Sequence, residues 1–114
     1  MRIILKKALN ILIIDDHQLV RDGIKTMLYS KNDKYDFVIT EADTGERGIQ
    51  KTLENTFDII LADYQLPDTL GPDMVKRILL KRPKAKILAL SSYDEYACIK
   101  NMINAGAKGY ILKN

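Results

Sequence analysis

Three aspartates, two serines and a lysine occupy places in the sequence from which their side chains could act together. Each lies at or just after the end of an apolar run that has the length of a buried strand. Carboxylates can hold a divalent cation or attack an electrophile, and hydroxyl and ammonium groups can bind the oxygens of an anion. The residues concerned are Asp15, Asp16, Asp63, Ser91, Ser92 and Lys113.

The apolar runs alternate with segments whose apolar residues recur at helical spacing. In the segment from Asp94 to Ala105, for example, Ile99, Met102 and Ile103 should face inward, with Gly106 as the C-terminal cap. The helix that starts at Thr44 has few apolar positions and should be the least buried. The expected strands cover residues 11–14, 35–40, 58–62, 86–90 and 109–112, and the expected helices cover residues 17–30, 44–54, 72–82 and 94–105.

This alternation predicts an α/β protein with a parallel sheet and helices on both of its faces. For five strands the common arrangement is the three-layer, flavodoxin-like doubly wound fold with strand order 2-1-3-4-5. A fifth helix, after the last strand, is absent from this chain. We expect one domain over residues 10–114, preceded at residues 1–9 by an extension that is flexible, helical or an added strand.

The composition excludes several classes of protein. A net charge of +3 on 114 residues is too small to indicate nucleic-acid binding by this chain. One cysteine, Cys98, permits no internal disulfide, and one Cys with one His cannot form a structural zinc site. No apolar run approaches the roughly 20 residues that cross a bilayer. We therefore expect a cytoplasmic protein.

Parallel strands bring their carboxyl ends to one edge of the sheet, so the six residues should share a crevice. Three carboxylates close together repel one another and raise one another's pKa unless a cation lies between them. Because the donors are oxygens, we expect Mg²⁺, which favours a phosphoryl ligand. Asp63, at the end of the central strand, is placed to attack phosphorus while Asp15 and Asp16 hold the ion.

From about residue 10 to residue 113, the sequence resembles the receiver domain of two-component response regulators. The resemblance rests on Asp15-Asp16, on Asp63 with Pro67 four places later, on Ser91, and on Lys113 with Tyr110 three places before it. It implies a signalling domain that is not an enzyme but assists its own phosphorylation and dephosphorylation. Its Asp63 would receive a phosphoryl group from the phosphohistidine of a sensor histidine kinase.

The resemblance also implies how the ion and the switch work. Asp16, Asp63 and the backbone carbonyl of Gln65 would hold Mg²⁺, with Asp15 acting mainly through water. Ser91 would move to bind the phosphoryl group, and Tyr110 would rotate inward, although it could be an ordinary core residue. This change would alter the surface that controls the output.

The stretch from Asp15 to Gly23 (DDHQLVRDG) is similar to regulators whose output is a LuxR-type helix-turn-helix domain. Transcription would then be controlled through a DNA-binding domain that this chain lacks, and we expect a fragment or a truncated chain. Asn114 also stands where the family often has proline. We expect a monomer for this chain and a homodimer for the whole phosphorylated protein.

Two other functions fit parts of the pattern. An aspartate-nucleophile phosphatase of the haloacid dehalogenase kind would also use Mg²⁺, but it needs an acid two places after the nucleophile, where this chain has Gln65. A receiver-like interaction module without phosphorylation would not need the acidic cluster. His17 lies one residue past the site and is expected to be neither a ligand nor a phosphoacceptor, and Cys98 is expected to be inert.

Overall fold

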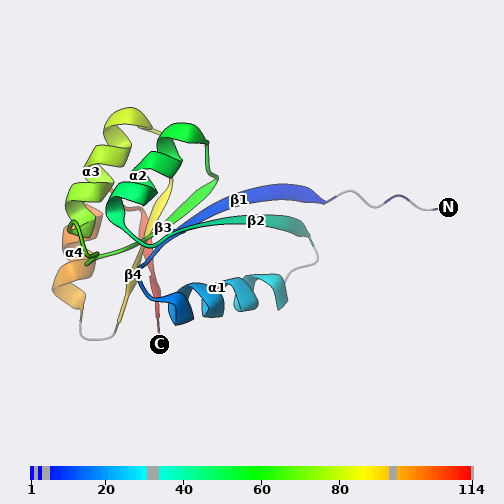
Figure 1. The fold of residues 1–114 in the computed structure, drawn as a ribbon, viewed down its shortest axis with the longest axis horizontal. Coiled ribbons are helices and arrows are strands. Elements are labelled where there is room, and N and C mark those ends of the chain that lie inside the picture. Colours follow the sequence, from blue (N-terminus) through cyan, green and yellow to red (C-terminus); the bar gives the residue numbers. More distant parts are fainter. Residues whose placement is uncertain (2, 4–5, 31–33, 93–94, 114) are drawn as a thin grey trace.

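The computed structural model describes residues 1, 3, 6–30, 34–92 and 95–113. Five parallel strands form one sheet in the order β2-β1-β3-β4-β5, so the predicted fold class and strand order are confirmed. The chain alternates strands and helices throughout (Figure 1). The elements are β1 (Lys7–Ile14), α1 (Gln18–Ser30), β2 (Tyr35–Ala42), α2 (Gly45–Glu54), β3 (Ile59–Asp63), α3 (Gly71–Lys81), β4 (Ile87–Ser91), α4 (Tyr96–Ala105) and β5 (Gly109–Leu112).

The two faces of the sheet are covered unequally. Alternate residues of the strands pack against α2, α3 and α4 on one face, where Leu12, Ile60 and Met74 belong to one apolar cluster. The other face carries a smaller cluster in which Ile13 and Leu90 pack with Ile24 of α1. Figure 1 shows α1 alone on its side of the sheet and the other three helices together on the opposite side. The central strands β1, β3 and β4 are therefore covered on both faces, which explains their unbroken apolar runs.

The first strand begins earlier than the sequence pattern predicts. β1 starts at Lys7, and its residues Lys7 to Asn10 pair with Tyr35 to Val38 of β2. The separation of residues 1–9 from the fold was therefore wrong for Lys7, Ala8 and Leu9, which are part of the sheet. Ladder hydrogen bonds need no apolar side chain, so a strand can extend into polar sequence when its neighbour is as long.

Two predictions about helix burial were also wrong. α2 is not the least buried helix, because Gly45, Gly48, Ile49 and Thr52 are all buried, whereas Met102 is the one buried residue of α4. A Cβ on Gly48 would lie 2.6 Å from Ile14 Cδ1, so glycine lets α2 lie directly on β1. In α4, Ile103 faces outward with 40% of its surface exposed.

The helix ends follow the expected local chemistry. The Thr44 hydroxyl accepts a hydrogen bond from the Arg47 N–H and caps α2. Pro72 lies in the first turn of α3, where its missing N–H has no partner to lose. Gly106 ends α4 with a φ of 126°, a conformation that favours glycine. The predicted start of α4 at Asp94 lies outside the described residues.

Candidate functional site at the carboxyl edge of the sheet

The strand ends converge as parallel pairing requires. Asp15 follows β1, Asp63 is the last residue of β3, and Lys113 follows β5. Asp15 is fully buried and Asp63 is 4% exposed, so the fold removes both carboxylates from water. Asp16, Asp63 and Lys113 line a cavity of about 530 Å³ at this edge.

Lys113 joins the two buried carboxylates. Its Nζ donates a hydrogen bond to Asp63 Oδ1 at 3.0 Å and lies 3.1 Å from Asp15 Oδ2. Its backbone N–H donates to the Ser91 carbonyl at 2.6 Å, which ties the lysine to the end of β4. The ammonium is therefore fixed from both ends, by its backbone and by its charge.

The surroundings shift the pKa values of this pair. Burial raises the pKa of Asp63 above its ordinary value, and the negative charge of Asp15 acts in the same direction, while the hydrogen bond from Lys113 opposes both. Burial alone would lower the pKa of Lys113, but its interactions with Asp63 and Asp15 hold that pKa above the ordinary value. Lys113 is thus a permanent cation at neutral pH.

Asp15 is held from several directions. Its N–H donates to the Ala42 carbonyl at 3.1 Å, and its own carbonyl accepts from Arg21 Nη1. Its Oδ1 accepts the His17 N–H at 2.8 Å, and its Oδ2 forms the ion pair with Lys113 Nζ. A buried carboxylate needs such a cation beside it, because burial penalises an unpaired charge.

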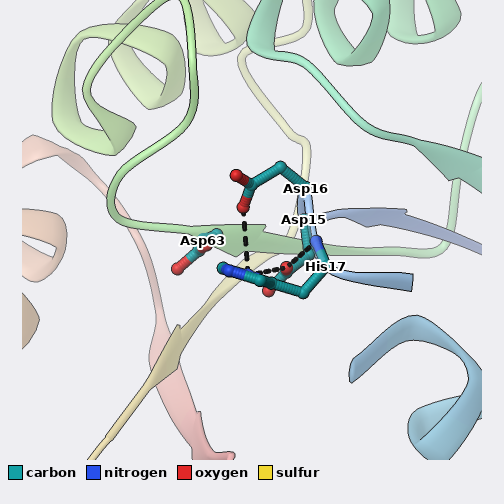
Figure 2. Close-up of side chains that lie close together, drawn as sticks. All are labelled: Asp15, Asp16, His17 and Asp63. Carbon is teal, nitrogen blue, oxygen red and sulfur yellow. Dashed lines mark hydrogen bonds and ion pairs between the residues drawn. The ribbon is translucent and has the colours of Figure 1, made fainter. Parts of the chain in front are cut away.

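His17 lies inside the site, contrary to the prediction that it falls outside it. Its Nδ1 is 3.1 Å from Asp15 Oδ1 and 3.1 Å from Asp16 Oδ1. Figure 2 shows the ring joined by dashed lines to both carboxylates, with Asp63 beside them. One potential ligand atom from each of these four residues lies within 4.8 Å of every other.

The donor set fits the expected cation. Three carboxylates face one ammonium, so the cluster carries excess negative charge when all are ionised. The hard oxygen donors of these carboxylates suit Mg²⁺. These residues could therefore hold the ion that the sequence predicts.

The other predicted residues are near the site but do not meet its carboxylates directly. The Ser91 side chain is buried, and its hydroxyl donates to the Ser92 carbonyl at 3.1 Å. Gln65 is exposed on the rim of the cavity, which Cys98 also lines. Tyr110 is 54% exposed, so it is not the core residue considered as an alternative.

The sequence argument overlooked Arg21, which fixes the Asp15 backbone. Arg21 is buried, and besides the Asp15 carbonyl it binds Glu41 Oε1 at 3.0 Å and Gln18 Oε1 at 2.6 Å. Its position could have been noticed, because Arg21 precedes Ile24 by three residues on the inward stripe of α1. A charged residue on a buried stripe indicates a specific partner.

The loop after β3 is hydrogen-bonded to the start of α2 and is closed by a bond between its own two ends. Both carboxylate oxygens of Asp68 accept backbone N–H groups at the start of α2, from Gly45 at 2.8 Å and Glu46 at 2.9 Å. Gly71 N–H donates to the Tyr64 carbonyl at the other end of the loop. These bonds fix the backbone that follows Asp63.

Comparison with known proteins agrees with this geometry. The family model described as "Response regulator receiver domain" matches residues 11–114. The chain belongs to the response regulator receiver domain family. The predicted family is thereby confirmed.

Two transcriptional regulatory proteins are similar in sequence to this receiver domain. It is 31% identical to the transcriptional regulatory protein DegU of Brevibacillus brevis over 95% of this chain and 45% of that protein. It is 38% identical to the transcriptional regulatory protein YdfI of Bacillus subtilis over 91% of this chain and 47% of that protein. The receiver domain therefore spans about half the length of these curated relatives.

A solved structure is similar throughout the receiver domain. A two-component response regulator of the LuxR family from Aurantimonas superposes with a TM-score of 0.81 at 29% identity, covering 95% of this chain and 76% of the other.

No helix among the described residues has the length and apolar character that a membrane crossing needs.

Proposed function

We propose that this receiver domain is a phosphoacceptor and that Asp63 is the residue phosphorylated. The observation that carries the proposal is the position of the Asp63 carboxylate, which is buried at the end of β3, bonded to Lys113 Nζ and close to Asp15 and Asp16. In this position one oxygen is bound to a cation, and the site retains acidic groups for a metal ion.

The chemistry would be a direct phosphoryl transfer. An oxygen of Asp63 attacks the phosphorus of a sensor kinase phosphohistidine, the phosphorus–nitrogen bond breaks, and the histidine nitrogen leaves with the bonding electrons and takes up a proton. The product is an acyl phosphate on Asp63. Lys113 balances the added negative charge of the phosphoryl oxygens.

Asp15, Asp16, Asp63 and the Gln65 backbone carbonyl would hold Mg²⁺. When bound, this ion supplies positive charge that draws phosphoryl oxygens into the site and stabilises them during transfer. Arg21 and Ala42 hold the backbone of Asp15 in place. Asp15 therefore offers the ion site a carboxylate that is ordered and buried. Asp16, which is more exposed, completes the acidic side of the cavity.

The output would be a change of surface between α4 and β5. The Ser91 hydroxyl now binds the Ser92 carbonyl, so its movement to a phosphoryl oxygen would exchange one acceptor for another. Tyr110 is exposed and would rotate inward in response. We propose that this surface controls a DNA-binding output domain in the cytoplasm, with a homodimer in the phosphorylated state. The relatives that are named transcriptional regulatory proteins support an output in transcription.

A small phosphodonor with Mg²⁺ tests the acceptor directly. Intact-mass spectrometry should show the gain of one phosphoryl group, labile to base, in the native chain and none in Asp63→Asn. The matched control is Asp58→Asn, an exposed acid just before the same strand, which should accept the group normally. An undiminished gain in Asp63→Asn, or no gain in the native chain, would refute the assignment.

A further inference from the structure

The single histidine of the chain has its ring nitrogen where a metal ligand would lie. Among its 114 residues the chain has one His, His17. Its N–H donates to the Asp15 side chain at 2.8 Å, and its ring lies beside the Asp15 and Asp16 carboxylates (Figure 2). His17 Nδ1 then lies 3.1 Å from both Asp15 Oδ1 and Asp16 Oδ1.

These separations match those of donors that share one ion. In an octahedral site with bonds of about 2.1 Å, neighbouring ligand atoms are about 3 Å apart. His17 Nδ1 has this spacing from each of the two oxygens. One ligand atom from each of Asp15, Asp16, His17 and Asp63 also lies within 4.8 Å of every other, so the ring nitrogen belongs to the same cluster as the carboxylates.

We infer that His17 is a metal ligand that makes this site prefer first-row transition ions that favour nitrogen donors, such as Ni²⁺, over Mg²⁺. Mg²⁺ takes oxygen donors, whereas imidazole nitrogen strengthens the binding of first-row transition ions in the order that peaks near Cu²⁺. The inference rests on the proposed function, because it adds a fourth side chain to the same ion site. It changes which ion the receiver domain selects when several compete.

The ring has room to reorient toward an ion. Its side chain is 65% exposed, so one edge meets the carboxylates and the rest meets solvent. An ion that replaced the two nitrogen–oxygen contacts would leave the imidazole in place as a donor. The alternative is that His17 only orients the carboxylates through hydrogen bonds.

Calorimetric titration of the untagged chain with Ni²⁺ and with Mg²⁺, at one fixed pH, separates these roles. The variants are His17→Ala, which removes the ring, and His17→Asn, whose amide can still donate to the carboxylates but binds metal poorly. Both should lose about tenfold or more in Ni²⁺ affinity, with Mg²⁺ affinity unchanged or higher. Cys98→Ser should match the native chain, which excludes the thiol on the cavity wall.

Each other outcome overturns the inference. If His17→Asn binds Ni²⁺ as tightly as the native chain, hydrogen bonding to the carboxylates accounts for the whole effect of His17 on metal binding. An equal loss for both ions in the two His17 variants means that the residue shapes the site without choosing the ion. If Mg²⁺ binds and Ni²⁺ gains nothing from His17, the inference fails alone; if the native chain binds neither ion, the magnesium part of the proposed function fails with it.

A spectroscopic measurement identifies the ligand atom. Pulsed electron paramagnetic resonance of bound Mn²⁺ should show coupling to an imidazole nitrogen, and labelling histidine with ¹⁵N should change that coupling. Because the chain has one histidine, the signal can come only from His17. A Mn²⁺ spectrum without this coupling would show that the ion has oxygen ligands alone.

Discussion

Asp63 is a carboxylate that the fold stabilises poorly in its ionised form. Its only described side-chain cation partner is Lys113, and the backbone N–H of Tyr64 is its other hydrogen-bond donor. Burial outweighs these contacts and raises its pKa. Further positive charge near Asp63 would stabilise its ionised form, and a pKa shifted by burial is typical of functional sites.

The raised pKa of Asp63 predicts a stability change in Asp63→Asn. A folded-state pKa above the unfolded value means that ionised Asp63 lowers stability above the folded pKa, and that the loss disappears as the pH falls toward the unfolded value near about 4. Without Mg²⁺, the variant should therefore be more stable than the native chain at pH 7. Thermal melts between pH 7 and pH 4 should show this advantage shrinking, and an advantage that grows toward acid would contradict it.

The sequence predicted that Asp15, Asp16, Asp63 and Lys113 meet, because strand ends of a parallel sheet share an edge. It could not predict where the side chain of a loop residue lies. His17 was excluded because it lies one residue past the site in the sequence, yet the Asp15 side chain accepts its N–H and its ring lies beside the carboxylates. Such a local hydrogen bond between a side chain and the backbone has no periodic signature in the sequence.

At the scale of elements, close approach of backbones positions the site as much as apolar contact does. A Cβ on Gly71 would lie 2.6 Å from the Asp63 carbonyl and 2.7 Å from Met102 Sδ. The start of α3 therefore packs directly on the strand end that carries the acceptor. A helix that packs through glycines has few apolar residues, so the number of its apolar residues underestimates its burial. This is why the sequence wrongly predicted that α2, with its two buried glycines, is the least buried helix.

Gly71→Ala should therefore destabilise the fold and impair phosphoryl acceptance together. Overpacking of this kind costs roughly 1–3 kcal/mol. The matched control is Gly23→Ala within α1, where a Cβ would meet nothing within 4 Å and should stabilise the helix by about 1 kcal/mol. Urea unfolding checks both variants, and a neutral Gly71→Ala would contradict the close packing at α3.

Asp68→Ala tests the connection between the loop after β3 and α2. The change removes the two acceptors that serve Gly45 and Glu46 and leaves the helix start less well capped. We expect a loss of about 1–2 kcal/mol in the free energy of unfolding. Asp73→Ala, an exposed acid in the first turn of α3, should cost less. Equal losses for the two variants would mean that Asp68 stabilises the start of α2 through its negative charge alone and not through the two hydrogen bonds.

For the whole molecule, strand order was predictable because parallel crossovers permit few arrangements. The length of β1 was not, because its first residues are held by β2 and not by an apolar core. In Figure 1 these two strands project from the body of the domain, toward the N-terminus. Lys7 and Ala8 are exposed, whereas Ile11 to Ile14 are buried.

Hydrogen exchange should resolve this difference along one strand. We expect the amides of Ile11 to Ile14 to exchange only through global unfolding, and those of Lys7 and Ala8 to exchange faster through local opening. β5, an edge strand with alternating exposure, should also open locally. Mass spectrometry of peptides from both halves of β1 provides the test, and uniform protection from Lys7 to Ile14 would contradict it.

The hydrogen bond between Lys113 and Asp63 spans 50 residues of sequence. The strands that carry the two residues are not neighbours, because β4 lies between β3 and β5 in the sheet. During synthesis, Asp63 would leave the ribosome long before Lys113, so a partly made chain would have the carboxylate without the cation beside it. Under the proposed function, phosphorylation would then be confined to chains that have formed the whole sheet.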